Sequence, residues 1–444
     1  MKVKQFEDKS LAHYSYAILE PGSASIVLID PARDPQPYLD YAAAQQAKIV
    51  AVIETHPHAD FVSSHAELQE LTGADIYCSV HTDAAYAHKT FDEGQTISIG
   101  TMTLRAINTP GHSPDSISIV LNNAGQDYAV FTGDTLFIGD CGRPDLRENA
   151  GNQKAKREAL AAQMYHSLRE KLLLLANDVV VYPAHGAGTL CGKDLRDASQ
   201  STIGEERQSN WSLQPMEEAE FIVTLLKDQP FIPQYFGYDV DLNRKGAPVL
   251  QASLSTIKVL QPAVSFIPDE IVIDTRAADH FKAGHLPGSF NIMLEGKFET
   301  WLGAIVPPED PFYLLAATKE QLKEAMERAA RIGYEPFIKA GLLLDSGSEQ
   351  QTPFDSAYFR AHNQDFTIID VRNGPEVKKR QIFPHALHIP LPELRLRLKE
   401  IPLDKPIAVH CAGGYRSAAA SSILEAALPD NLEITDIGEH IREF

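Results

Sequence analysis

The stretch Thr55-His56-Pro57-His58-Ala59-Asp60-Phe61 decides how the first half of this chain is interpreted. It directly follows residues 48–54, an apolar and β-branched run that predicts a buried strand. Two imidazoles and a carboxylate on one tight loop past a strand end form a metal-ligand pattern. Because a lone histidine is more often structural, this interpretation depends on finding further ligands elsewhere in the chain.

Three later strand-like runs end in the same way. Residues 102–107 precede His112, residues 128–131 precede Asp134, and residues 178–182 precede His185. Enzymes built on sheets carry their chemistry on the loops that follow the strands. We therefore expect His56, His112 and Asp134 to bind one metal ion.

Two histidines and one carboxylate are the facial triad of non-haem Fe(II) oxygenases, which leaves positions open for substrate and O₂. Zn²⁺ fits the same residue types, so the ligand set alone does not decide the metal. The neighbouring polar side chains are expected to orient the ligands or to anchor their loops. These neighbouring residues are His58, Asp60 and His185.

A second chemistry lies far downstream, in the loop Cys411-Ala412-Gly413-Gly414-Tyr415-Arg416-Ser417. It stands between a predicted strand, residues 407–409, and a predicted helix. Backbone N–H groups and a helix N-terminus lower the pKa of a cysteine and stabilise a thiolate or persulfide anion. Cys411 and Arg416 are thus the candidate catalytic pair, and the other five residues form the sulfur-binding loop. A Cys-x₅-Arg phosphatase loop is the competitor, but its arginine stands one residue later.

The second half also contains an internal repeat. Residues 271–276 match residues 367–372, and residues 311–315 match residues 406–410. The alignment places Ala316 opposite Cys411 and Gln321 opposite Arg416, so the first copy has neither nucleophile nor cation. Two α/β units follow, and we expect the first to be inactive.

The metal-ligand set resembles the metallo-β-lactamase fold, whose usual loop reads Thr-His-x-His-x-Asp-His. Phe61 replaces the last histidine, which normally serves a second metal together with the loop aspartate and a later histidine. The resemblance therefore implies one metal ion. The segment Cys141-Gly142-Arg143-Pro144-Asp145 is similar to that of persulfide dioxygenases, the iron-dependent branch. There the arginine lies near the substrate, which implies a catalytic role for Arg143. Cys191 follows His185 closely enough to be a secondary thiol.

The Cys411 loop resembles the Cys-x-x-Gly-x-Arg loop of rhodaneses, and the whole chain resembles persulfide dioxygenase–rhodanese fusion proteins. The implied fold is a multidomain α/β protein. An αββα sandwich would span residues 1–248, an inactive rhodanese-like domain residues 249–347, and an active one residues 348–444. The implied activity is Fe(II)-dependent oxidation of a low-molecular-weight thiol persulfide by O₂ to sulfite. Cys411 would transfer sulfane sulfur and form thiosulfate, in sulfide detoxification.

Two alternatives remain open. One is a zinc thioester hydrolase, similar to glyoxalase II, with rhodanese modules as sulfur carriers; Phe61 counts against it. The other is a degenerate scaffold that stores or senses persulfide through Cys411 alone; the intact set of three ligands counts against that.

The composition excludes several classes of protein. A chain of 444 residues predicts two to four domains, and a net charge of −20 argues against a nucleic-acid or acidic-membrane partner. Four cysteines do not form a disulfide framework and suit a reducing compartment. We find neither a signal peptide nor an apolar run that could span a bilayer, and we expect a cytoplasmic homo-oligomer.

Overall fold

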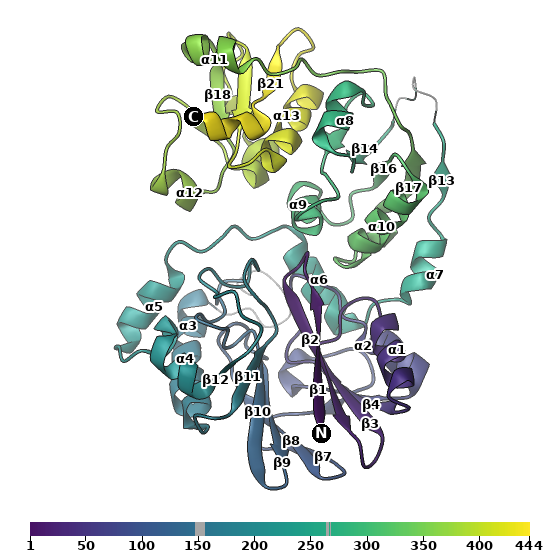
Figure 1. The fold of residues 1–444 in the computed structure, drawn as a ribbon, viewed down its shortest axis with the longest axis vertical. Coiled ribbons are helices and arrows are strands. Elements are labelled where there is room, and N and C mark those ends of the chain that lie inside the picture. Colours follow the sequence, from purple (N-terminus) through teal and green to yellow (C-terminus); the bar gives the residue numbers. More distant parts are fainter. Residues whose placement is uncertain (147–155, 263–265, 267) are drawn as a thin grey trace. The chain divides into compact units, whose positions relative to one another are not determined.

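The computed structural model describes residues 1–146, 156–262, 266 and 268–444. These form two compact units (Figure 1). The first comprises residues 1–252 with residues 331–333, and the second comprises residues 253–330 with residues 334–444. None of the helices in these described ranges is long and apolar enough to cross a membrane.

The first unit contains two six-stranded sheets that pack face to face. One sheet has the order β1-β2-β3-β4-β5-β6 and the other the order β12-β11-β10-β9-β8-β7. The strands of the first sheet are β1 (Lys2–Asp8), β2 (His13–Glu20), β3 (Ser25–Ile29), β4 (Lys48–Ile53), β5 (Asp75–Cys78) and β6 (Lys89–Thr90). Those of the second are β7 (Thr96–Ile99), β8 (Met102–Asn108), β9 (Ile117–Asn123), β10 (Gln126–Gly133), β11 (Val180–Pro183) and β12 (Ser201–Thr202).

Successive side chains along β2 point to opposite faces of the sheet, and this alternation shows how the layers form. Tyr16 and Ile18 face the other sheet, whereas Ala17 and Leu19 join the cluster that α1 (Gln36–Ala44) and α2 (His65–Thr72) cover. The outer face of the second sheet packs against α3 (Arg157–His166) and α5 (Glu218–Leu226) in a third apolar cluster. The predicted αββα sandwich is confirmed. The remaining helices of this unit are α4 (Ile203–Ser209), α6 (Tyr235–Lys245) and α7 (Leu250–Ser255), the last of which crosses into the second unit.

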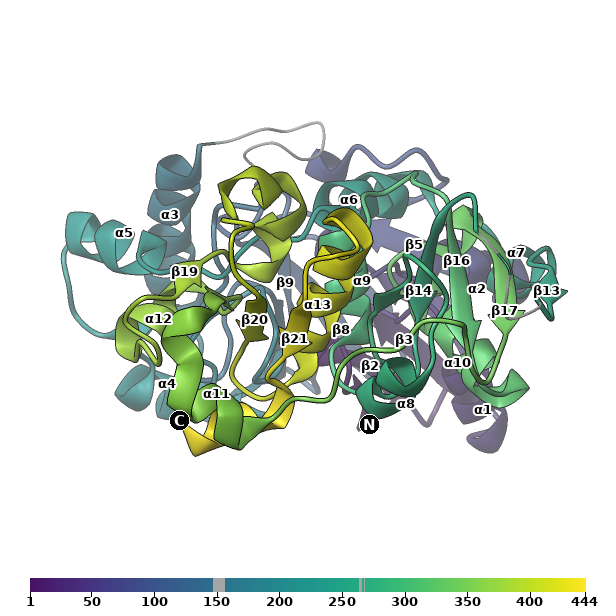
Figure 2. The same cartoon turned by 90° about the horizontal axis from the view of Figure 1, so that it is seen from above.

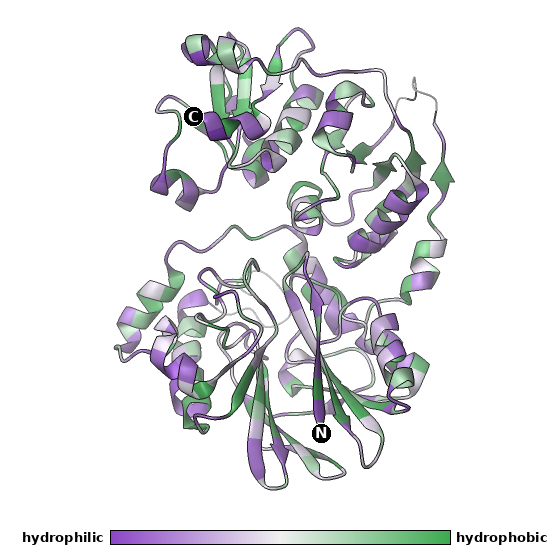
Figure 3. Cartoon of the chain, in the orientation of Figure 1, coloured by the Kyte–Doolittle hydropathy of each residue, from purple (hydrophilic) through white to green (hydrophobic). Residues whose placement is uncertain are grey.

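The second unit carries two smaller parallel sheets, as the internal repeat predicts. The first has the order β13-β17-β16-β14-β15 and the second the order β19-β18-β20-β21. Figure 3 shows the hydrophobic residues concentrated on these strands. The strands are β13 (Val259–Leu260), β14 (Ile271–Asp274), β15 (Phe290–Asn291), β16 (Phe312–Ala316), β17 (Ile338–Leu343), β18 (Thr367–Asp370), β19 (Leu387–His388), β20 (Ile407–His410) and β21 (Ile434–Asp436).

The two copies repeat one local detail. Asp274 ends β14 and pairs with Arg276 at 2.6 Å, and Asp370 ends β18 and pairs with Arg372 at 2.5 Å. The helices of the first copy are α8 (Ala278–Ala283), α9 (Phe298–Ile305) and α10 (Lys319–Ala330). Those of the second are α11 (Ser356–His362), α12 (Gly374–Lys379) and α13 (Tyr415–Ala427), the last of which packs on β20 and β21 (Figure 2).

Candidate active site

The three predicted metal ligands come together at the ends of three strands. His56 follows β4, His112 follows β8 and Asp134 follows β10, and one ligand atom from each lies within 4.8 Å of the others. Oδ2 of Asp134 lies 3.5 Å from Nε2 of His112 and 3.8 Å from Nε2 of His56. All three side chains are buried. Two imidazoles and a carboxylate at this spacing can hold one divalent transition-metal ion.

Charge at this cluster favours a cation. Burial alone would raise the pKa of Asp134, but His185, His112 and His56 lower it well below its usual range, so the carboxylate is ionised. Its Oδ2 is buried and accepts no hydrogen bond in the described part of the chain. Burial lowers the pKa of His112, which keeps that imidazole neutral and able to ligate. A buried anionic oxygen without a donor fits a site that binds a metal ion.

Hydrogen bonds orient both histidines. Nδ1 of His112 lies 2.9 Å from the carbonyl oxygen of Arg143, which can only accept, so Nδ1 carries the proton and Nε2 presents a lone pair. Nδ1 of His56 lies 3.1 Å from Oγ1 of Thr55. Thr55 donates its hydroxyl proton to Asp30 at 2.8 Å and therefore accepts from His56. Both rings thus aim Nε2 at the cluster.

His185 connects two carboxylates next to the cluster. Its Nδ1 lies 2.8 Å from Oδ1 of Asp134 and its Nε2 lies 2.9 Å from Oδ2 of Asp60. Burial alone would lower the pKa of His185, but the two carboxylates raise it well above its usual value. The structure therefore places Asp60 and His185 in contact with each other and with a ligand, where they can orient Asp134.

His58 packs beside the ligand cluster, with its ring centroid 4.1 Å from that of His56. Its Nε2 lies 3.3 Å from Oδ1 of Asp30, and its ring packs 4.3 Å from that of Phe61, centroid to centroid. Phe61 also packs 3.8 Å from His13. This buried aromatic ring stands at the seventh position of the loop and brings no ligand atom to the side of the cluster where Asp60 and His185 lie.

The segment after Asp134 approaches the cluster through its backbone. A Cβ on Gly142 would lie 1.9 Å from the carbonyl oxygen of Asp134 and 3.0 Å from Nδ1 of His112, so only glycine fits there. The guanidinium of Arg143 makes two bonds to Asp145, at 2.6 and 2.7 Å, and another to the carbonyl of Leu190. Its charge is thus already paired, and what reaches the cluster is its carbonyl oxygen.

Cys191 lies against the same group of residues. It is buried, and its thiol lies within 4.8 Å of ligand atoms of Asp60 and His185. Burial, and then Asp60 and Asp134, raise the pKa of this thiol well above its usual value. Cys191 is therefore held as a thiol rather than a thiolate in this structure.

The second predicted site lies in the loop between β20 and α13. Gly414 donates its backbone N–H to Sγ of Cys411 at 3.1 Å, and Oγ of Ser417 lies 3.6 Å from the same sulfur. Gly414 has a φ of 103°, which the turn requires and which favours glycine. Ala412 and Gly413 complete the loop, and α13 begins at Tyr415.

Arg416 is oriented by a partner that the motif did not reveal. Its two terminal nitrogens lie 2.6 and 2.7 Å from the carboxylate oxygens of Glu376, at the start of α12. Its guanidinium also lies 5.9 Å from the ring of Trp301, on α9 of the first copy. Tyr415 donates its hydroxyl to the carbonyl oxygen of Met293, also in the first copy. The first copy therefore contributes a wall of the Cys411 site.

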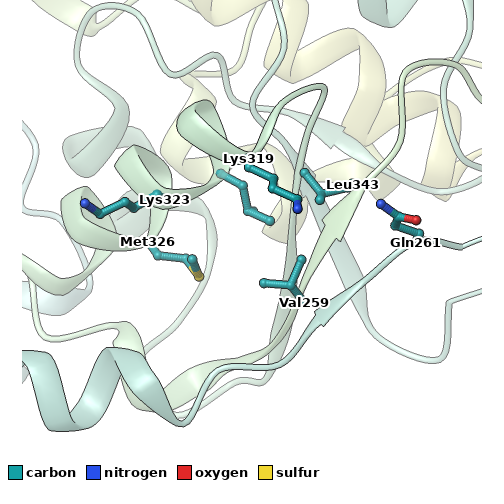
Figure 4. Close-up of a pocket in the computed structure, with 7 residues that line it drawn as sticks. Val259, Gln261, Lys319, Lys323, Met326 and Leu343 are labelled. Atoms are coloured by element: carbon teal, nitrogen blue, oxygen red, sulfur yellow. The ribbon is translucent and has the colours of Figure 1, made fainter.

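The corresponding loop of the first copy lacks this chemistry. Ala316 ends β16 and α10 begins at Lys319, so no thiol lies at that strand end. An open pocket of about 480 Å³ lies in this copy between β13, α10 and β17 (Figure 4), and none of the predicted site residues lines it. Its lining consists of Val259, Gln261, Lys319, Leu322, Lys323, Met326 and Leu343.

Sequence reasoning missed Asp30 and Glu376. Asp30 follows β3 as the ligands follow their strands, and its φ of 48° is unusual for a residue other than glycine. Its position directly after a predicted strand could have identified Asp30 from the sequence as a residue near the site. Glu376 had no comparable signal, because its contact with Arg416 joins residues 40 positions apart.

Comparisons with known proteins agree with this geometry. Residues 11–185 match the metallo-beta-lactamase superfamily, and residues 263–348 and 355–438 each match the rhodanese-like domain. The mouse (Mus musculus) protein named persulfide dioxygenase ETHE1, mitochondrial, is 31% identical over 212 residues, which are 47% of this chain and 73% of that protein. The Arabidopsis thaliana protein named hydroxyacylglutathione hydrolase cytoplasmic is 31% identical over 176 residues, 39% of this chain and 63% of that one.

A solved structure extends the similarity. The metallo-beta-lactamase from Staphylococcus aureus subsp. aureus COL is 30% identical, with a TM-score of 0.68, and covers 77% of this chain and 99% of that one. Its likeness therefore reaches beyond the first unit. The chain belongs to the persulfide dioxygenase family of the metallo-β-lactamase superfamily, joined here to two rhodanese-like domains.

Proposed function

We propose that residues 1–248 oxidise a low-molecular-weight thiol persulfide with O₂, using one Fe(II) ion held by His56, His112 and Asp134. The observation that carries this proposal is the cluster of two imidazoles and one ionised carboxylate, with Phe61 in place of the last histidine of the loop. Such a ligand set leaves coordination positions for substrate and O₂. The family membership supports persulfide as the substrate class.

The reaction is balanced with water as a reactant. R–S–SH, O₂ and H₂O give R–SH, sulfite and two protons; the S–S bond breaks, the outer sulfur is oxidised and O₂ is reduced. Bound Fe(II) supplies the redox chemistry that lets O₂ react with a sulfur. The chain holds the two imidazoles as lone-pair donors through Arg143 and Thr55, and keeps Asp134 ionised beside His185.

Cys411 carries out a separate sulfur transfer in the proposal. Its thiolate attacks the outer sulfur of R–S–SH, forming the Cys411 persulfide and releasing the R–S⁻ thiolate. Sulfite then removes that sulfur as thiosulfate and restores the Cys411 thiol. The N–H of Gly414, 3.1 Å from Sγ, supports this by stabilising negative charge on sulfur. Arg416, which Glu376 holds in place, interacts electrostatically with Cys411.

We assign residues 348–444 to this sulfurtransferase and residues 249–347 to a partner module without a nucleophile. In that module Trp301 contacts Arg416, and the carbonyl oxygen of Met293 accepts from Tyr415. These contacts are consistent with a module that helps to hold the Cys411 loop in place. Sulfite made by the first domain would then be consumed by the last.

The deciding experiment measures O₂ uptake with glutathione persulfide by anaerobically purified protein, with the metal content of the same sample. Iron-dependent uptake with sulfite or thiosulfate as product is expected, and Asp134→Asn should abolish it. Zinc-loaded protein that hydrolyses S-lactoylglutathione and takes up no O₂, even after iron reconstitution, would instead indicate a thioester hydrolase.

A further inference from the structure

We infer that His285, Glu349 and Glu425 form a second divalent-metal site, within the unit that holds both rhodanese-like copies. One ligand atom from each of the three lies within 4.8 Å of the others. Nε2 of His285 lies 3.7 Å from Oε2 of Glu349 and 3.6 Å from Oε2 of Glu425. One imidazole and two carboxylates form a ligand set that Zn²⁺ accepts, with a remaining position for water.

The imidazole is built into the fold as a ligand would be. The side chain of His285 is 1% exposed, and its ring stacks on that of Phe281, with centroids 4.0 Å apart. Nδ1 lies 3.0 Å from the carbonyl oxygen of Phe281, so the proton of a neutral ring resides on Nδ1. This is the arrangement by which metal-binding histidines fix their tautomer.

The other ring nitrogen, Nε2, faces two carboxylate oxygens, which are hydrogen-bond acceptors as it is. Nε2 has no hydrogen-bond partner among the described residues, and it presents a lone pair to two carboxylate oxygens. Three acceptors that converge in this way need either a proton or a metal cation between them.

No lysine or arginine in the described ranges neutralises the two carboxylates. Burial and Asp430 raise the pKa of Glu349, and burial and Glu349 raise that of Glu425, although Gln351 acts in the opposite direction on Glu425. Nε2 of Gln351 donates to Oε2 of Glu425 at 2.7 Å and helps hold that carboxylate in place. The nearby cation of Lys282 is paired with Asp436 instead.

The three ligands come from three segments of the chain. His285 follows α8 of the first copy, Glu349 lies in the segment that joins the copies, and Glu425 lies on α13, the helix that begins just after Cys411. The backbones of His285 and Glu349 already exchange two hydrogen bonds, at 2.8 and 3.1 Å. A cation here would fasten the joining segment to the helix of the sulfur-carrying loop.

The test counts Zn²⁺ bound to the full-length chain after chelator treatment, reloading and desalting. We expect about two equivalents for the unsubstituted chain and about one for Glu349→Gln, because an amide is a poor replacement for an anionic ligand. Glu349 is 45% exposed, so this change should not prevent folding. Glu433→Gln, an exposed glutamate of the same copy, is the matched control and should keep both.

A second variant distinguishes metal binding at the dioxygenase cluster from metal binding at the inferred site. Asp134→Asn should lose the other equivalent, and the double variant should bind close to none. Equal Zn²⁺ in Glu349→Gln and the unsubstituted chain would overturn the inference and leave a proton-bridged cluster. Loss in Glu349→Gln with no loss in Asp134→Asn would instead overturn the metal site of the proposed dioxygenase. As a second readout, Zn²⁺ should raise the melting temperature of Asp134→Asn more than that of the double variant.

Discussion

Nε2 of His185 lies 2.9 Å from Oδ2 of Asp60, so two residues that could hold a second metal ion bind each other instead. The side chain of Phe61 is buried beside them and brings no ligand atom. Both features act in the same direction. The three ligands His56, His112 and Asp134 stay available for one metal ion. In the second group Asp60 and His185 form a buried ion pair that orients Asp134, and Cys191 is held as a thiol.

Phe61→His should restore the missing ligand and raise the bound Zn²⁺ by about one equivalent per chain, because imidazole, Asp60 and His185 would then surround one point. The measurement is metal content after reloading with Zn²⁺. Phe61→Leu is the control, since it changes the packing but adds no nitrogen. Equal metal content in the two variants would show that the Asp60–His185 contact, not Phe61, closes the second position.

His185→Gln should weaken metal binding at the dioxygenase cluster by about 10- to 100-fold, the range found when groups that orient ligands are removed. The reason is that Asp134 loses the donor at 2.8 Å that fixes its Oδ1. Metal competition with a chromogenic chelator measures the change. His166→Gln, an exposed histidine on α3, should leave the affinity unchanged.

Gly142→Ala should destabilise the first unit by about 1–3 kcal/mol and lower its metal content, as overpacking of a close contact does. The added carbon would need the space of the Asp134 carbonyl oxygen, 1.9 Å away, and both Asp134 and His112 would move. Gly374→Ala meets nothing within 4 Å and is the matched control. Urea unfolding with metal analysis gives both quantities; normal metal content in Gly142→Ala would show that the backbone can adjust.

Apolar runs were sufficient to find β4, β8, β10 and β11, because buried strands leave short hydrophobic runs that end at polar loops. They did not reveal the edge strands β1, β6, β7 and β12, which are short or partly exposed and so carry no such run. The same loops supplied His56, His112 and Asp134, since residues that follow neighbouring strands meet at one edge of a sheet. Contacts between segments that are distant in the sequence could not be predicted in this way. Asp30 lies 25 positions before Thr55, and the pairing of Arg143 with Asp145 and Leu190 depends on how its loop folds back.

Cys411→Ser should abolish thiosulfate formation from glutathione persulfide and sulfite while O₂ uptake continues, because a hydroxyl cannot carry sulfane sulfur. Cys191→Ser is the contrasting variant. The pKa of the Cys191 thiol is raised well above its usual value by burial, so sulfur transfer should persist without it. Separate assays of O₂ and thiosulfate check this, and full thiosulfate production by Cys411→Ser would remove Cys411 from the reaction.

The contact between Arg416 and Glu376 predicts a pH dependence of stability. Burial alone would raise the pKa of Glu376, but Arg416 lowers it below its usual value of 4.5. A carboxyl whose folded pKa is depressed adds stability above its unfolded pKa and loses it as the pH falls through the folded value. Glu376→Gln should therefore lower the melting temperature at pH 7 and leave it nearly unchanged well below pH 4. Glutamine keeps the bond with which Glu376 accepts from the N–H of Asn373, so the start of α12 is preserved. A difference between the two proteins that is equally large at both pH values would show that Glu376 acts through packing rather than through its charge.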